Sequence, residues 1–323
     1  YAKAYGQFRD PAYLEALHHG VAFLRNAHRN VRTGGYAWQL SWRDGKKQVI
    51  DGDNHCYGLA FVLLAYSHAL AAGMTEARAY MKETFELMEK RFWQAGHGLY
   101  ADQASADWKV LDPYRGQNAN MHACEALIAA FEASGETHYL QRAVTLARNV
   151  TMRQAGLAGG MIWEHYHADW SVDWNYNRDD KSNIFRPWGY QPGHLTEWAK
   201  LLLLLERHPV ALDGDTEWLA PRAAQLFDIA LGKAWDAEHG GIVYGFGPAD
   251  EICDGDKYFW VQAESFAAAA MLAERTGDPR YWDWYDRIWA YSWEHFVDHE
   301  HGAWYRVLSP SNAKLGNEKS PAG

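Results

Sequence analysis

The sequence predicts an all-α fold in which pairs of helices alternate with short β-hairpins and the array closes into a toroid. The first observation is an internal period. A glycine followed by an aromatic or β-branched run recurs five times, at 35–38, 98–101, 160–163, 241–244 and 302–305. The second is that two helical segments with an apolar face lie between most successive runs. The third is that polar and aromatic residues gather where these helices are expected to begin.

The spacing between these glycines is 63, 62, 81 and 61 residues. A repeat built from two helices and a hairpin is typical of stacked or closed helical arrays. An open solenoid is the alternative, and we favour closure because polar groups at several helix starts must converge to act together. The long spacing contains an insertion at 164–190, rich in Trp, Asp and Asn. Long loops within a compact domain are often functional.

Nine helices are expected, at 11–27, 54–72, 75–91, 118–134, 137–153, 191–207, 216–234, 260–276 and 279–296, and residues 1–8 are expected to end another. Two of them begin with a capping aspartate followed by proline, at Asp10 and Asp278. Three end at a glycine that can adopt the left-handed conformation: Gly73, Gly135 and Gly277. Glycine before each apolar run, with polar residues after it, predicts a hairpin.

Composition excludes several classes of protein. The chain has 323 residues, of which 48% are hydrophobic, and its net charge of −10 without a basic cluster argues against nucleic-acid binding. Apolar runs are too short for a membrane span. The three cysteines, Cys56, Cys124 and Cys253, lack paired or metal-like spacing, which is typical of a reducing cytoplasm. We therefore expect one cytoplasmic domain over residues 1–323.

The segment 183–200 carries the strongest chemical signal. His194 and Glu197 lie three residues apart near an expected helix start, where Pro192 suits the first turn. The positive end of the helix dipole favours a neutral imidazole, and a neighbouring carboxylate can orient the ring. We expect Glu197 to be that carboxylate. A neutral, oriented histidine near pH 7 is suited to general acid–base catalysis.

A second pair has the same form. His122 and Glu125 again lie three residues apart near a helix start, just after Asn118. One such pair is often only structural, because buried histidines commonly have carboxylate partners. Two pairs, each after a polar loop and before an apolar helix, favour a functional site.

Three longer motifs resemble a known family. Residues 115–122 (Arg-Gly-Gln-Asn-Ala-Asn-Met-His), 185–198 (Phe-Arg-Pro-Trp-Gly-Tyr-Gln-Pro-Gly-His-Leu-Thr-Glu-Trp) and 260–264 (Trp-Val-Gln-Ala-Glu) resemble the N-acylglucosamine 2-epimerase superfamily. Within it they are most similar to bacterial aldose–ketose isomerases that act on mannose and, in a close branch, on sulfoquinovose. The resemblance covers the whole chain, with the hairpin glycines in register.

The resemblance implies an (α/α)6 barrel and a metal-free, cofactor-free interconversion of an aldose and a 2-ketose through a cis-enediol. It also implies twelve helices, a substrate-binding arginine before Tyr1 and a catalytic histidine after Gly323. We therefore expect a single (α/α)6-barrel domain that is truncated at both ends. The substrate is expected to be D-mannose, D-fructose or a close analogue, with no nucleic-acid or membrane partner. The sequence leaves the oligomeric state open.

Site residues transfer from the family position by position. The catalytic set is His194, Glu197 and Glu264. The substrate-binding set is His122, Asn118, Trp260, Arg186 and His55, of which the last two are the weaker transfers.

Four alternatives stay open. A sugar 2-epimerase of the same superfamily, acting on N-acylglucosamine or mannose, uses a similar carbanion and differs in where the proton returns. A glycoside hydrolase on a helical toroid needs two carboxylates; the candidates are Glu164, Asp169, Asp173 and Glu264. A metal enzyme would draw on His122, Glu125, His165, His167, His194 and Glu197, although their spacing matches no standard ligand pattern. A non-catalytic sugar-binding module is the fourth.

Overall fold

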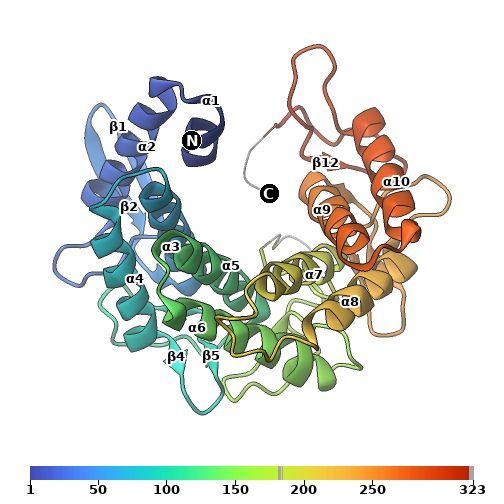
Figure 1. Ribbon diagram of the computed structural model, residues 1–323, viewed down its shortest axis with the longest axis horizontal. Coiled ribbons are helices and arrows are strands. Elements are labelled where there is room, and N and C mark those ends of the chain that lie inside the picture. The colour runs from blue at the N-terminus through green and yellow to red at the C-terminus, as the bar shows by residue number, and fades with distance from the viewer. Residues whose placement is uncertain (181–182, 184, 320–323) are drawn as a thin grey trace. The chain divides into compact units, whose positions relative to one another are not determined.

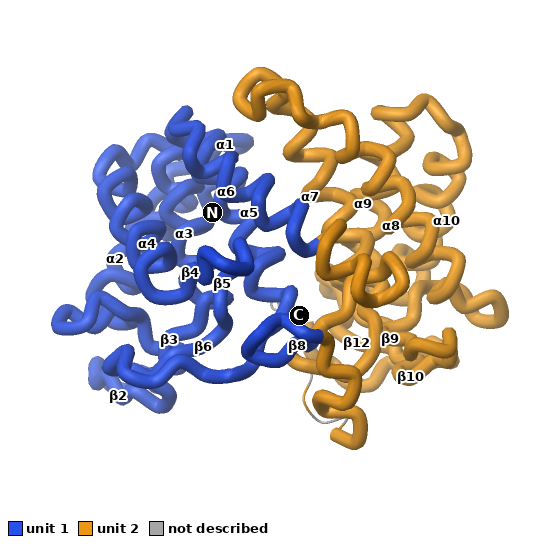
Figure 2. The backbone as a smooth tube through the Cα atoms, turned by 90° about the horizontal axis from the view of Figure 1, so that it is seen from below, with its two compact units in different colours: residues 1–150, 165–171 blue, residues 151–164, 172–323 orange. Residues whose placement is uncertain are grey.

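The computed structural model describes residues 1–180, 183 and 185–319, and within these residues the chain forms ten α-helices joined by short strands (Figure 1). Contacts divide the chain into two compact units. Unit 1 comprises Tyr1–Val150 and His165–Ser171, and unit 2 comprises Thr151–Glu164 and Val172–Gly323 (Figure 2). A single domain over 1–323 stays a prediction. None of the described helices is both long and apolar enough to cross a membrane.

Unit 1 contains the first six helices. They are α1 (Ala2–Phe8), α2 (Pro11–Phe23), α3 (Cys56–Ala71), α4 (Ala77–Arg91), α5 (Gln117–Ser134) and α6 (Thr137–Arg148). Helix α3 packs on α5, while α4 packs on α3 and α6 packs on α5. Figure 1 shows α3 and α5 side by side in this unit. Short π-helical turns, Leu24–His28 and Asn149–Gln154, extend α2 and α6.

Unit 2 repeats this scheme with four helices. They are α7 (Pro192–Glu206), α8 (Leu219–Ala234), α9 (Phe259–Thr276) and α10 (Pro279–His295). Helix α7 packs on α8 and α9, and α9 packs on α10. The leucines of α7 are almost all buried, which explains why its apolar run was visible in the sequence. All nine expected helices are present, with ends that shift by a few residues.

The capping signals act as predicted. Asp10 accepts a hydrogen bond from the backbone N–H of Ala12, and Asp278 accepts one from that of Arg280. Helices α5 and α9 end at Gly135 and Gly277, whose φ angles of 75° and 69° are left-handed. These local bonds satisfy backbone groups that a helix end otherwise leaves unpaired.

The predicted hairpins follow a common plan. In four of them the chain turns back between two bridged residues: Arg29 and Tyr36, Trp93 and Tyr100, Trp235 and Ile242, Val297 and Trp304. Strands β4 (Trp93–Gln94) and β5 (Leu99–Tyr100) form the second of these turns. A longer hairpin, β1 (Gln39–Arg43) with β2 (Lys46–Asp51), follows the first. At the remaining glycine, the Gly160 N–H donates to the Ala155 carbonyl.

A second set of strands connects neighbouring repeats. We call α3, α5, α7 and α9 the inner helices. The two residues before three of them pair with a strand that follows the next hairpin: β3 (Asn54–His55) with β6 (Gln103–Ala104), β7 (Arg115–Gly116) with β8 (His165–Tyr166), and β11 (Lys257–Tyr258) with β12 (Val307–Leu308). Before α7, Tyr190 bridges to Phe246 of β9 (Gly245–Phe246), which also pairs with β10 (Ile252–Asp254). Each inner helix therefore begins beside backbone hydrogen bonds that connect it to the next repeat.

Buried amides fix the rotation of the inner helices. The Asn120 side chain accepts from the Tyr100 N–H at 2.7 Å and donates to the Tyr100 carbonyl at 3.0 Å. Gln262 does the same with Ile242, at 3.0 and 2.9 Å. Residues two positions away on a helix point to nearly the opposite side. The clamp at Asn120 therefore turns Asn118 and His122 away from the hairpin.

The three cysteines are free, as their spacing predicted. Burial raises the pKa of the Cys56 and Cys124 thiols, so both stay protonated and unreactive.

Candidate active-site residues in the two units

His194 sits in the first turn of α7 and is buried. Its Nδ1 lies 3.0 Å from Oε1 of Glu164, which is also buried. The ring of Trp260, from the start of α9, lies with its centroid 5.3 Å from that of the imidazole. The imidazole of His194 therefore lies between a buried carboxylate and an indole that come from other segments of unit 2.

Gly193 makes this arrangement possible. A Cβ at position 193 would lie 2.5 Å from Cζ3 of Trp260 and 2.9 Å from Cγ2 of Val261. Only a residue without a side chain lets the start of α7 approach the start of α9 so closely. The glycine in the sequence motif 185–198 is therefore a packing requirement for the Trp260–His194 contact.

Glu197 is buried one turn after His194. The sequence analysis assigned the orientation of the His194 ring to Glu197, and this role stays a prediction. The structure in addition places Oε1 of Glu164 3.0 Å from Nδ1. Between these two positions, the Thr196 hydroxyl contacts the Ser265 hydroxyl at 2.9 Å and so ties α7 to α9. Glu164 entered the sequence analysis only as a hydrolase candidate, because nothing local relates residues thirty positions apart.

Glu264 forms an ion pair with Lys200 of α7, and both side chains are largely buried. The sequence analysis selected Glu264 and missed Lys200. The sequence could have indicated Lys200, because it is a charged residue inside the apolar run of α7. The ammonium keeps a carboxylate at this position compensated inside the protein.

Two tyrosines extend the aromatic surface beside Trp260. The Tyr244 ring lies 6.1 Å from Trp260 and 4.1 Å from Tyr258. Burial raises the pKa of Tyr244, and the neighbouring Tyr258 and the charge of Glu164 raise it further. Burial, with the charges of Asp254 and Asp256, likewise raises the pKa of Tyr258. Both phenols therefore stay protonated and can donate hydrogen bonds.

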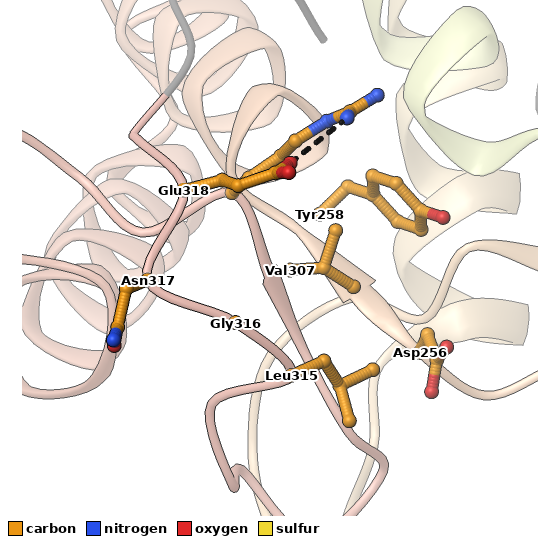
Figure 3. Close-up of a pocket in the computed structure, with 8 residues that line it drawn as sticks. Asp256, Tyr258, Val307, Leu315, Gly316, Asn317 and Glu318 are labelled. Atoms are coloured by element: carbon orange, nitrogen blue, oxygen red, sulfur yellow. Dashed lines mark hydrogen bonds and ion pairs between the residues drawn. The ribbon is translucent and has the colours of Figure 1, made fainter.

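Two cavities share Asp256 and Tyr258. The larger, about 460 Å³, is lined by Asp256, Tyr258, Arg306, Val307, Leu315, Gly316, Asn317 and Glu318 (Figure 3). The smaller, about 330 Å³, is lined by Asn183, Pro187, Tyr244, Cys253, Asp254, Gly255, Asp256 and Tyr258. Burial and the charge of Asp254 raise the pKa of Asp256. None of these lining residues was selected from the sequence.

In unit 1, His122 and Glu125 form the pair that their spacing predicted. Nδ1 of His122 lies 3.2 Å from Oε2 of Glu125. The rings of Tyr57 and Phe61, from α3, lie 5.0 and 4.8 Å from the imidazole. Aromatic rings therefore wall the imidazole of His122, and its side chain is 15% exposed.

His55 and Asn118 belong to the same unit. The Trp38 ring is tilted against His55 at 4.5 Å and lies 6.0 Å from Tyr57, so His55 joins the aromatic cluster that walls His122. Asn118 lies one turn before His122 on α5. Its Oδ1 is buried and has no hydrogen-bond partner among the residues that the structure describes. A buried unpaired acceptor is unfavourable unless a ligand or water supplies a donor.

Arg186 lies in the insertion at 164–190. Its Nη1 donates to the Tyr176 hydroxyl at 3.2 Å, and its carbonyl accepts from Nδ2 of Asn177 at 2.8 Å. The structure thus shows this predicted substrate-binding residue bonded within its own loop. Two of the hydrolase candidates lie in different settings: Asp169 is exposed and caps a surface turn at Ser171, whereas Glu164 is buried beside Nδ1 of His194.

Comparison with known proteins identifies the family of this chain. The chain matches the N-acylglucosamine 2-epimerase (GlcNAc 2-epimerase) family over residues 1–323. It is 50% identical to a D-mannose isomerase of Marinomonas mediterranea, over 100% of this chain and 80% of that protein. It is 36% identical to a D-mannose isomerase of Thermobifida fusca, over 91% and 71%.

A solved structure gives the same result. The crystal structure of a D-mannose isomerase superposes with a TM-score of 0.94 at 50% identity, covering 100% of this chain and 80% of that chain. This similarity confirms the predicted fold class, an all-α fold of the (α/α)6-barrel type with short hairpins between helix pairs. The chain belongs to the N-acylglucosamine 2-epimerase family.

Proposed function

We propose that this chain is a D-mannose isomerase, which interconverts D-mannose and D-fructose through a cis-enediol. The observation that carries the proposal is the buried His194, which lies beside the carboxylate of Glu164 and is covered by Trp260, in a chain 50% identical to a D-mannose isomerase. Such a histidine is positioned to exchange protons with a sugar hydroxyl.

The reaction sets the demands on the site. The sugar ring opens, the C2 proton leaves as the enediol forms, and a proton returns to C1. At the same time the hydroxyl proton on O2 is lost and O1 gains one. His194 is assigned the ring-opening proton and the transfer between the two oxygens. The proton that moves from C2 to C1 is assigned to the second catalytic histidine that the family resemblance implies. Donors that hold the developing enediolate oxygens commonly provide the largest part of catalysis.

Substrate-binding roles are assigned within each unit. In unit 2, Trp260 offers an apolar face to the C–H face of a sugar. The carboxylate of Glu264, whose charge is balanced by Lys200, is assigned to accept a hydrogen bond from a sugar hydroxyl. In unit 1, His122 and Asn118 are assigned to sugar hydroxyls, and the unpaired Oδ1 of Asn118 supports this role. His55 and Arg186 keep the weaker substrate-binding assignments.

The test is the fate of D-mannose in D2O with this protein, followed by NMR. The expected product is D-fructose with deuterium at least partly incorporated at C1. Cleavage of a glycoside without C–H exchange would contradict the assignment and favour a hydrolase. Formation of D-glucose in place of D-fructose would show that the proton returns to C2.

A sugar 2-epimerase is the second candidate, because the family matched over residues 1–323 takes its description from that activity. The two reactions share the deprotonated intermediate. Incubation with N-acylglucosamine and with D-mannose in parallel separates them, since a 2-epimerase inverts C2 and yields no ketose.

A further inference from the structure

We infer that Lys257 is a positioning residue of the substrate pocket: its buried ammonium holds the cavity wall that Asp256 and Tyr258 form, from the side opposite the cavity. That the cavities bind sugar rests on the proposed function, whereas the position of the wall does not. The primary observation is that Lys257 is fully buried and that its ammonium donates three hydrogen bonds.

The three acceptors come from the hairpin before β11 and from the loop after β12. Nζ of Lys257 donates to Oδ2 of Asp236 at 2.8 Å, to the Pro310 carbonyl at 2.8 Å and to Oδ1 of Asn312 at 3.0 Å. We call these four residues the Lys257 cluster. An ammonium has three N–H donors, so the cluster uses all of them and fixes the side chain. The carboxylate of Asp236 compensates the buried charge.

The alternation of side chains along the strand separates Lys257 from the cavities. Asp256, directly before β11, and Tyr258 line both cavities. Lys257 lies between them in the sequence and bonds within its own cluster. Successive side chains of a strand point to opposite sides, so the cluster lies on the side away from the cavities. The two residues that line the cavities are therefore held through the residue between them.

This wall adjoins the aromatic surface of the candidate active site. The Tyr258 ring lies 4.1 Å from the Tyr244 ring, which lies 6.1 Å from Trp260. Tyr258 is also the N-cap residue of α9, the helix that carries Trp260. A displacement of β11 therefore changes the surface beside Trp260, whereas His194 belongs to α7, which contributes no residue to the Lys257 cluster.

The same cluster fixes a second part of the cavity lining. Oδ1 of Asn312 also accepts from the Tyr291 hydroxyl at 2.8 Å, and Nδ2 of Asn312 donates to the His239 carbonyl at 2.7 Å. Its φ of 66° is left-handed, a conformation that asparagine adopts more readily than most residues. The chain then continues into residues 315–318, which line the larger cavity (Figure 3). The position of this segment therefore depends on the Lys257 cluster.

Lys257→Met is the informative change, because it keeps an unbranched side chain of similar length and removes the ammonium. The carboxylate of Asp236 and two further oxygens then lose their donor. Lys233→Met is the matched control, because it makes the same change at a lysine of α8 that pairs with the exposed Asp250. Asn312→Gly is a second test: glycine adopts the left-handed backbone conformation, so only the side-chain amide is lost.

The first measurement is independent of activity. Hydrogen exchange followed by mass spectrometry reports the opening of backbone bonds such as Arg306 N–H to the Glu318 carbonyl, 3.0 Å, and Leu315 N–H to the Val307 carbonyl, 3.2 Å. Lys257→Met is expected to raise exchange over residues 306–318 about tenfold or more, because it removes hydrogen bonds from a charged donor. Lys233→Met should keep the wild-type rates.

Wild-type exchange over residues 306–318 in folded Lys257→Met would overturn the inference. If Lys257→Met does not fold, Asn312→Gly decides in its place. It is expected to raise exchange over the same residues by a smaller factor, and unchanged exchange in that variant would equally overturn the inference.

The second measurement is turnover of D-mannose. Lys257→Met is expected to raise KM about tenfold with a smaller change in kcat, because the cluster shapes the pocket and carries no proton-transfer group. Asn312→Gly should change KM in the same direction and Lys233→Met should be normal. A lower urea midpoint in Lys257→Met with normal KM and normal exchange without urea would show that Lys257 only stabilises the fold, contrary to the inference.

The two proposals fail separately. If Lys257→Met loosens residues 306–318 but the wild-type protein does not isomerise D-mannose, the proposed function is wrong and the positioning role of Lys257 in the cavity wall stands. If the wild-type protein isomerises D-mannose while Lys257→Met keeps normal KM and normal exchange, the function stands and the positioning role is wrong.

Discussion

Trp260 lies directly against the backbone of Gly193, so close that a Cβ at position 193 would come within 2.5 Å of its ring. This contact joins the starts of α7 and α9, and it places the indole over His194. The absence of a side chain at Gly193 in α7 thus sets the position of the Trp260 ring of α9.

Gly193→Ala is expected to displace Trp260 or the first turn of α7 and to lower turnover of D-mannose about tenfold or more, because a misplacement near 1 Å can cost about 10²-fold. Gly232→Ala is the control, since a Cβ there meets nothing within 4 Å. In a helix interior it should be neutral or stabilising by about 0.5–1 kcal/mol. Normal kcat/KM in Gly193→Ala would show that the contact is dispensable.

His194→Ala is expected to lower kcat about 10²–10⁴-fold, the usual loss for a positioned acid–base group. Glu197→Gln should cost less, because it does not itself transfer the proton. His18→Ala, which changes an exposed histidine of α2, is the control. Steady-state kinetics measures kcat, and circular dichroism checks that each variant is folded. If His194→Ala and Glu197→Gln both fold and keep near-normal rates, His194 has a structural role only.

Gln262→Ala is expected to destabilise the protein by about 2–4 kcal/mol, because it leaves the N–H and carbonyl of Ile242 buried without their partner. Urea denaturation measures the change, and the exposed Gln7→Ala should leave the midpoint in place. A shift no larger than that of the control would mean that backbone bridging alone holds the hairpin.

Stability should fall in acid through Asp236. Burial raises the pKa of Asp236, but hydrogen bonds from the buried Lys257 and from the backbone N–H groups of His239 and Glu238 outweigh it, so the net pKa is lowered. A carboxyl with a lowered folded pKa stabilises above the unfolded value of about 3.9 and loses this contribution as pH falls through the folded value. Thermal melts between pH 7 and 3 are expected to show a smaller acid-induced drop in Asp236→Asn than in the wild type.

Prolonged chelation is expected to leave turnover unchanged, because the proton transfers are assigned to histidine side chains. The measurement is the initial rate on D-mannose after dialysis against a chelator, with a mock-dialysed sample beside it. Loss of activity that returns on adding a divalent ion would support the metal-dependent alternative.

The sequence by itself determined what depends on neighbouring residues. The caps at Asp10 and Asp278, the left-handed ends at Gly135 and Gly277, and the His122–Glu125 pair follow from backbone geometry within one turn. Such interactions need no knowledge of the fold, since i and i+3 positions are adjacent on any helix. The repeat and the family resemblance extended this local information to the fold class.

Only the tertiary structure decided which distant groups meet. Glu164 reaches His194 across thirty residues, and Lys200 reaches Glu264 across sixty-four, through packing of separate segments. No periodicity encodes such a pair, because its geometry depends on how α7, α9 and the Trp163 segment bury their apolar surfaces together. Sequence spacing therefore selected Glu197 as a partner of His194, and the packed structure added Glu164, which lies 3.0 Å from Nδ1.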